Sequence, residues 1–149
     1  MTSEWRPDDS LSERDQKGEL RGARRIKAAL TKNKVRLGKG VITSRDTGMA
    51  AVRRDLKRTG LPPGVSQSQI PIVLGHGGDF VCFISTLKPG TIVPEHAHKQ
   101  AVFRVVISGE LIFGRKTLKA GDWMFVPPGV AYSIEAGPKF PLHIFYGHG

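Results

Sequence analysis

The chain has few cysteines and no long apolar runs, the features that mark disulfide-rich and membrane-spanning proteins. It has a single cysteine, Cys82, so it cannot form an internal disulfide, and we expect a reducing, cytoplasmic environment. No apolar run approaches the roughly 18 residues that a membrane-spanning helix needs. The first residues also lack the apolar stretch of a secretory signal. A disulfide scaffold and a membrane span are therefore excluded, and a cytoplasmic protein is expected.

Acidic residues are scarce relative to basic ones, and the imbalance is uneven along the chain. Lys and Arg number 23 against 13 Asp and Glu, which gives a net charge of +10. The first 60 residues carry +8 of this charge, and the remainder carries +2. A nearly neutral second part is typical of a domain that binds a small molecule rather than a polyanion.

The basic first part, residues 1–60, predicts an extension that is mostly helical or disordered. Helix formers over residues 12–34 carry only a thin apolar stripe, with Ser12 as the expected N-cap, and a second helical stretch is predicted over residues 43–59. Three interpretations stay open: a solvated arm, an arm that binds nucleic acid or another polyanion, and an arm that packs on the domain or on a second subunit. Reading of DNA by the second stretch is disfavoured, because no short turn joins the two helices.

From residue 61 onward the sequence changes to short apolar runs separated by glycine and proline. The change follows Leu61-Pro-Pro-Gly64, which we take as the domain boundary. About eight such runs at regular spacing predict an antiparallel sandwich or barrel over residues 61–149. The predicted strands are 69–74, 79–87, 91–107 (one bent strand or two), 110–113, 118–122, 123–126, 131–136 and 140–146.

Two histidines, His96 and His98, are the best candidates for a chemical site. Residues two apart on a strand point to the same face, so both rings can hold one cation. The alternative is a pair of buried, hydrogen-bonded rings without a metal. The same alternation turns Gln100 and Arg104 inward. An inward Arg104 would bind a substrate carboxylate or form an ion pair at the rim of the barrel.

The residues around this pair resemble the first motif of the cupin superfamily: Gly90, five residues, His-X-His, and then Gly109 at the end of the strand. The segment Gly121-Asp-Trp-Met-Phe-Val-Pro-Pro-Gly129 resembles the second motif. This resemblance implies an all-β fold, an antiparallel cupin-type barrel also described as a double-stranded β-helix or jelly roll. It also implies a mononuclear site for a divalent transition metal (Fe, Zn, Mn or Ni) at His96 and His98.

Two positions depart from the cupin pattern. Where the family usually has a glutamate the chain has Val102, and where it usually has a third histidine the chain has Tyr132. The third ligand is left open between Tyr132 and His143, whereas His76 and His148 are expected to be surface residues.

The sequence leaves two functions open. The first is an enzyme of the dioxygenase, isomerase or lyase type that acts on a small acidic or ketonic molecule. Arg104 would then bind the acidic group, Gln100 and Phe125 would line the substrate site, and Tyr132 would handle a proton. The second is a non-catalytic ligand-binding or regulatory protein whose basic part contacts nucleic acid or a partner. A homodimer is expected because Phe103, Val105 and Ile107 form an outward apolar face.

Overall fold

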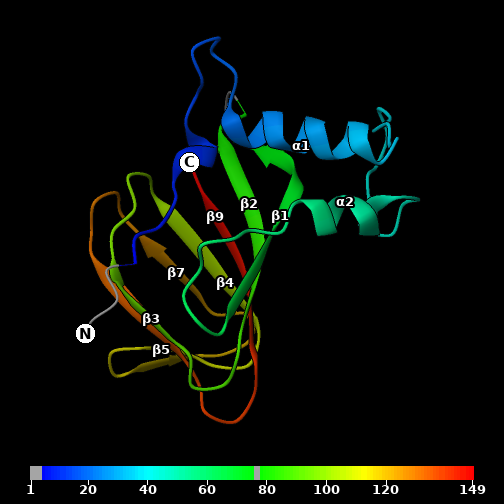
Figure 1. Ribbon diagram of the computed structural model, residues 1–149. Coiled ribbons are helices and arrows are strands. Elements are labelled where there is room, and N and C mark those ends of the chain that lie inside the picture. The colour runs from blue at the N-terminus through cyan, green and yellow to red at the C-terminus, as the bar shows by residue number, and fades with distance from the viewer. Residues whose placement is uncertain (1–4, 76–77) are drawn as a thin grey trace.

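Two antiparallel β-sheets close into a barrel that forms most of the structure (Figure 1). The structure is a computed structural model that describes residues 5–75 and 78–149. One sheet has the strand order β1 (Val65–Leu74), β2 (Phe80–Leu87), β9 (Leu142–His148), β4 (Val102–Ser108) and β7 (Trp123–Val126). The other has the order β3 (Ile92–His96), β8 (Tyr132–Ala136), β5 (Leu111–Phe113) and β6 (Lys116–Leu118). The predicted antiparallel barrel is confirmed.

The largest differences from the predicted strand boundaries occur in three places. The predicted run 91–107 divides into β3 and β4, with residues 97–101 as the connection. Strand β1 begins at Val65, four residues earlier than predicted, and the Gln67 amide in this polar stretch donates a hydrogen bond to Ser85 Oγ on β2 at 2.7 Å. Residues 119–122, predicted as a strand, instead form a turn in which the Asp122 carboxylate accepts a hydrogen bond from the Lys119 amide at 2.8 Å.

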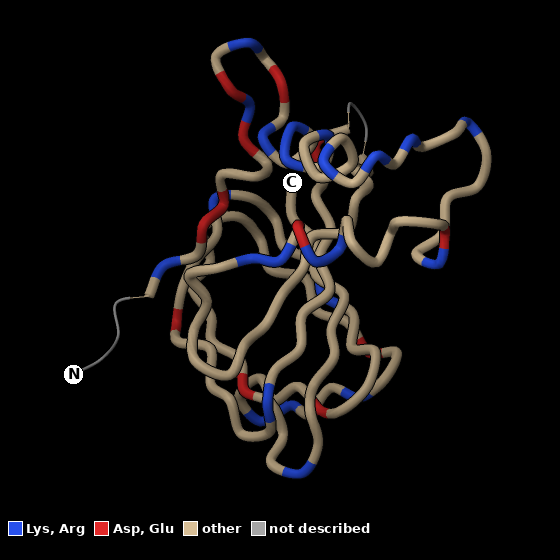
Figure 2. The backbone as a smooth tube through the Cα atoms, turned by 45° about the vertical axis from the view of Figure 1, so that its right-hand side comes forward, with Lys and Arg blue, Asp and Glu red and all other residues tan. Residues whose placement is uncertain are grey.

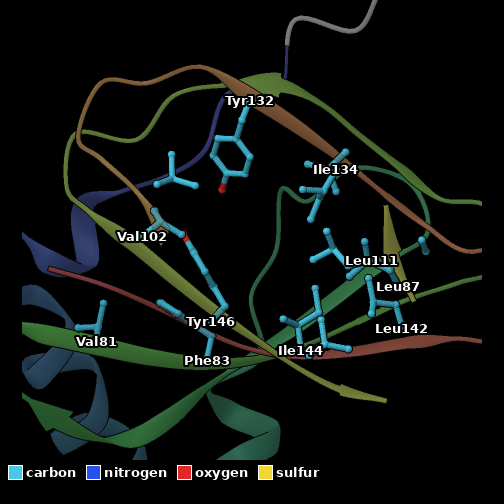
Figure 3. Close-up of a cluster of buried hydrophobic side chains, with 14 of the residues drawn as sticks. Val81, Phe83, Leu87, Val102, Leu111, Tyr132, Ile134, Leu142, Ile144 and Tyr146 are labelled. Atoms are coloured by element: carbon cyan, nitrogen blue, oxygen red, sulfur yellow. The ribbon is translucent and has the colours of Figure 1, made fainter. Parts of the chain in front are cut away.

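Strand β4 shows how the sequence builds the barrel interior. Val102, Arg104 and Val106 are buried, whereas Phe103 and Val105 between them face outward, as strand alternation predicts. Apolar side chains from both sheets meet inside (Figure 3). Because burial of a Val, Leu, Ile or Phe side chain contributes about 1.5–3 kcal/mol, this core is the main support of the site above it.

The N-terminal extension packs on the barrel instead of remaining a solvated arm. It contains the short 3-10 helix η1 (Ser10–Ser12) and the helices α1 (Arg21–Lys32) and α2 (Met49–Asp55). Ser12, the predicted N-cap, lies in η1 and does not cap α1, which begins nine residues later at Arg21. A second apolar cluster joins the helices to Val73 of β1 and contains Ile26, Ala29, Met49, Val52 and Leu56. None of the described helices combines the length and hydropathy needed to cross a bilayer.

Gly22 explains how closely α1 approaches the sheet. A Cβ atom at this position would lie 2.6 Å from a methyl group of Val81 on β2 and 2.7 Å from the Leu11 carbonyl oxygen. The Gly22 carbonyl also accepts a hydrogen bond from the Gln69 side chain at 3.1 Å. This glycine therefore lets the first turn of α1 contact the backbone and side chains beneath it.

Candidate functional site

The rings of His96 and His98 meet at one end of the barrel. Their Nε2 atoms are 3.1 Å apart, their ring centroids are 4.8 Å apart, and the ring planes are nearly perpendicular at 85°. Both residues are buried. The structure thus brings the two predicted side chains together, although β3 ends at His96 and His98 lies in the connection that follows rather than on the strand.

The partners of the other ring nitrogens fix the tautomer of each histidine. Nδ1 of His96 lies 2.7 Å from the Pro94 carbonyl oxygen, and Nδ1 of His98 lies 2.6 Å from Oδ1 of Asp9. A carbonyl and a carboxylate only accept hydrogen bonds, so both Nδ1 atoms carry the proton. In the neutral form of each ring Nε2 therefore carries no proton, and the two Nε2 atoms lie next to each other. Two unprotonated nitrogens at 3.1 Å need a proton or a cation between them.

The pair fits two of the ligands of a divalent transition metal. Burial is the main cause that lowers the pKa of His96 to about 4, so this ring is neutral at pH 7, as a metal ligand must be. For bonds of 2.0–2.1 Å, nitrogens 3.1 Å apart subtend an angle of about 95–100° at a shared ion. Within the described residues no set of three His, Cys, Asp or Glu side chains converges on one ion, so ligands from water or a bound molecule would complete the site.

Asp9, from the N-terminal extension, orients His98 and was missed by sequence reasoning. Its second carboxylate oxygen accepts a hydrogen bond from the Lys99 amide at 2.9 Å. Burial opposes ionisation of Asp9, but the hydrogen bonds from His98 and Lys99 outweigh this effect and lower the pKa of the carboxyl. A carboxylate behind a ligating imidazole is the usual second partner in metal sites. Trp5 also packs edge-on against His96, with ring centroids 4.9 Å apart, so the segment 5–9 covers the pair.

Arg104 is a buried cation beside this pair. Its side chain donates a hydrogen bond to the Tyr132 hydroxyl at 2.9 Å and lies 4.2 Å over the Tyr146 ring. Its Nε atom is buried without a hydrogen-bond partner, and within the described residues no carboxylate lies within ion-pair distance. The ion pair at the barrel rim, one of the two predictions for Arg104, is therefore not formed with any carboxylate of residues 5–75 and 78–149. A buried guanidinium in this state favours the entry of an anion.

Tyr132 lies where it can act on the same space. It is the cross-strand neighbour of His96, with ring centroids 4.6 Å apart. Tyr132 and Tyr146 point into the barrel from opposite sheets (Figure 3). Burial is the main cause that raises the pKa of Tyr146, so this phenol is neutral. The two hydroxyls therefore offer polar atoms to a molecule held by Arg104.

A small cavity and a larger hollow, both partly open to solvent, adjoin the site. The cavity has a volume of about 50 Å³, and its polar lining consists of Asp8, Arg58, Gln67, Ser85, His98, Arg104 and Tyr146. Since a water needs about 10–15 Å³ by this measure of volume, this space holds a few waters. The open hollow, of about 430 Å³, lies between segment 5–9 and the end of β3, with His96 in its wall. The lining of this hollow includes neither His98 nor Arg104, so a larger molecule would reach Arg104 only after segment 5–9 moves.

The remaining candidates lie in different environments. Phe125, predicted to line the substrate site, is 55% exposed and pairs with Phe103 on the outside of the barrel, so that expectation is corrected. Gln100 has a buried Oε1 atom without a described partner. His143 contacts Thr86 Oγ1, whereas His148, expected at the surface, is 1% exposed and bonded to Ser12. His76 lies outside the described residues.

Comparisons with known proteins agree with this architecture. A family model described as a cupin domain matches residues 83–146. No curated protein matches the chain. The chain aligns over 87% of its length with 77% of a chain in the complex of Rhodobacter sphaeroides SigE with the anti-sigma ChrR, at a TM-score of 0.53 and 16% identity. It aligns over 75% of its length with 79% of the polyketide cyclase RemF from Streptomyces resistomycificus, at a TM-score of 0.51 and 19% identity.

A third solved structure is a protein of unknown function with a cupin-like fold from Ralstonia eutropha. The alignment covers 58% of the present chain, with a TM-score of 0.49 and 16% identity. The present chain matches 55% of that protein, or about half of its length. The first two structures, with TM-scores of 0.53 and 0.51 and identities of 16% and 19%, show a shared fold and leave the activity to be argued from the site.

Proposed function

We propose that this chain, whose residues 83–146 match the cupin-domain model, is a cupin whose barrel binds a small anionic molecule beside a divalent metal ion held by His96 and His98. The observation that carries this proposal is the 3.1 Å approach of two Nε2 atoms whose rings both carry their proton on Nδ1. A divalent ion would satisfy both lone pairs at once. A single proton shared by the two atoms is the alternative, and it would place one positive charge on the pair beside the Asp9 carboxylate.

The choice of an anionic molecule rests on Arg104. A guanidinium presents a planar fork of donors that matches a carboxylate. In this protein the fork lies inside the barrel, has an unused buried Nε donor, and has no described carboxylate as partner. An acidic or enolised ketonic group bound there would neutralise the guanidinium charge and lie next to the histidine pair.

The chain's own residues would divide the work at such a site. Arg104 would orient the acidic group, and the Tyr132 hydroxyl would give or take a proton next to it. Asp9 would hold the His98 tautomer, and Trp5 would exclude water from the His96 side. A bound divalent ion would supply Lewis-acid polarisation of an oxygen atom on the substrate. Dioxygenase, isomerase and lyase reactions all use such an arrangement.

Metal analysis of the purified protein tests this proposal. We expect about one equivalent of a single transition metal in the wild type after reconstitution and dialysis, and loss of that metal in His96→Ala and in His98→Ala. His143→Ala is the matched control, because this histidine lies on the same barrel but bonds to Thr86. Less than about a tenth of an equivalent of any transition metal in the reconstituted wild type would overturn the proposal.

Segment 5–9, which covers the histidine pair, favours a second candidate function, a sensor that binds the same anion without turnover. Segment 5–9 covers both histidines, and the cavity of about 50 Å³ is too small for most metabolites. A sensor would release this segment when its ligand binds. If the protein converts a bound acid to a product, it is an enzyme. If it binds the acid and forms no product, it is a sensor.

We also propose that the protein is a homodimer. The outer face of β4 and β7 carries Phe103, Trp123 and Phe125, and the last two are 63% and 55% exposed. Phe103 and Trp123 contact each other with ring centroids 6.1 Å apart. An aromatic surface on the edge strand of a sheet is seldom left in water. Light scattering at micromolar concentration tests this state, and a monomeric mass would contradict it.

A further inference from the structure

The basicity of the protein belongs to one structural unit, the helical hairpin of residues 21–58. This segment contains 13 Lys and Arg residues and 2 Asp residues, so it carries +11. The rest of the chain contains 10 basic and 11 acidic residues and carries −1. The blue positions in Figure 2 gather accordingly on the helices and their connection, whereas the barrel strands are mostly free of charge. The charge is thus a property of this surface and not of the whole molecule.

Packing of the two helices on the barrel leaves most of these cations exposed to solvent. The apolar side of the hairpin is buried through Ile26, Ala29, Val52 and Leu56, and β1 supports it through Val73. Of the thirteen basic residues, eleven are exposed to solvent. They include all the basic residues in the connection between α1 and α2. The other two, Arg25 and Arg58, point inward, and Arg25 donates to the backbone carbonyls that end α2.

Most of the exposed cations have no neutralising partner. Within the described residues only three of the eleven form an ion pair, namely Arg24 with Asp15, Lys27 with Glu19 and Lys32 with Asp55, at 3.1–3.4 Å. The eight that remain include Arg36, Lys39 and Arg45 in the connection and Arg53 and Arg54 on α2. Such a density of positive charge repels itself, and a polyanion would relieve this repulsion.

We propose that the helical hairpin of residues 21–58 binds the phosphate backbone of double-stranded nucleic acid without reading its sequence. The segment contains no Phe, Trp, Tyr or His, so it lacks the stacking residues with which proteins hold unpaired bases. The 16 residues between α1 and α2 also separate the helices too far in sequence for a helix-turn-helix. The exposed positive charge is the remaining means of binding, and it suits the phosphates of a duplex. This inference is independent of the metal and anion site.

Fluorescence anisotropy with a labelled duplex of about 20 base pairs tests the proposal on the full chain. Because log K falls with log salt by about 0.9 per phosphate contact, five to eight contacts predict a loss of about 10³–10⁴ in affinity between 50 and 200 mM NaCl. The triple variant Arg36→Gln, Lys39→Gln, Arg45→Gln should bind at least tenfold more weakly at 50 mM NaCl and show a slope less steep by about 2–3. These side chains are exposed, so the variant should fold; Arg53→Gln with Arg54→Gln gives a second test on α2.

The matched control removes three cations from another surface. Arg115→Gln, Lys116→Gln, Lys119→Gln lies around β6 and gives the same net charge, +7, as the triple variant of the connection. We expect the control to bind the duplex within about twofold of the wild type. Equal losses in both variants would show that only net charge matters and would overturn the assigned surface. No binding at 50 mM NaCl, or displacement of the duplex by polyglutamate at equal charge concentration, would overturn nucleic acid as the partner.

Discussion

Replacement of Asp9 by asparagine is the sharpest test of how the site is built. The two carboxylate oxygens accept hydrogen bonds from His98 Nδ1 and from the Lys99 amide, at 2.6 and 2.9 Å. An asparagine has one acceptor and one donor group, so it can accept from only one of these two. If its NH₂ group faces His98, the ring proton must move to Nε2, which removes one of the two Nε2 lone pairs. If it faces Lys99, a buried donor loses its partner.

The expected magnitudes follow from these two outcomes. Loss of a partner behind a ligating histidine costs 10–100-fold in metal affinity, or about 1.4–2.8 kcal/mol. An unsatisfied buried donor costs about 1–3 kcal/mol of stability. Titration of zinc against a chromophoric chelator measures the first effect, urea unfolding measures the second, and the nitrogen shifts of ¹⁵N-labelled imidazole report the tautomer of His98.

Asp8→Asn is the control for Asp9→Asn, because it makes the same chemical change one residue earlier. The Asp8 side chain is 66% exposed and contacts Ser10 and Arg58 rather than the histidines. It should leave zinc affinity within about twofold of the wild type. The reasoning is refuted if Asp9→Asn lowers stability while zinc affinity and the His98 tautomer stay unchanged, since Asp9 would then only fasten the extension to the barrel.

Three further outcomes are expected. Arg104→Met should abolish binding of small carboxylates such as malonate, followed by calorimetry, and should leave stability unchanged or raise it by about 1–3 kcal/mol, since an unpaired buried charge is removed. Burial lowers the pKa of His148 from 6.5 to about 4, so the unfolded chain takes up a proton that the folded chain refuses. Stability should fall by about 2 kcal/mol between pH 7 and pH 5 from this residue, and His148→Gln should flatten the pH dependence of urea unfolding. Phe125→Asp should give a monomer by light scattering, whereas Phe140→Asp, at an equally exposed aromatic, should not.

The barrel was predictable because its signals are local. Alternation in Val102, Arg104 and Val106 identifies the inward face of β4 without knowledge of its neighbours. The approach of His96 and His98 was also predictable from their spacing, even though His98 lies beyond the end of the strand. In each case residues close in sequence determine which side chains share a face.

The residues whose positions were missed or predicted wrongly depend on contacts between distant parts of the chain, which no local sequence pattern encodes. Asp9 lies 89 positions from His98, and an aspartate in a polar terminal segment reads as solvated. Strand β7 is apolar at all four positions from Trp123 to Val126, so alternation cannot tell its faces apart. The structure turns Val126 inward and leaves Phe125 outside. His148 is buried because η1, through Ser12, covers the end of β9.

The two departures from the cupin pattern are best understood together with Arg104. At the position where the family usually has a third histidine, Tyr132 accepts a hydrogen bond from the guanidinium at 2.9 Å. Neither Val102 nor Tyr132 brings the negative charge that the usual glutamate would, and Arg104 adds a positive one. A divalent ion at the histidine pair would therefore bind more weakly before an anion enters and contacts both cations than after it. Metal and anion should then bind cooperatively, each raising the affinity of the other by the same factor, and Arg104→Met should remove that coupling.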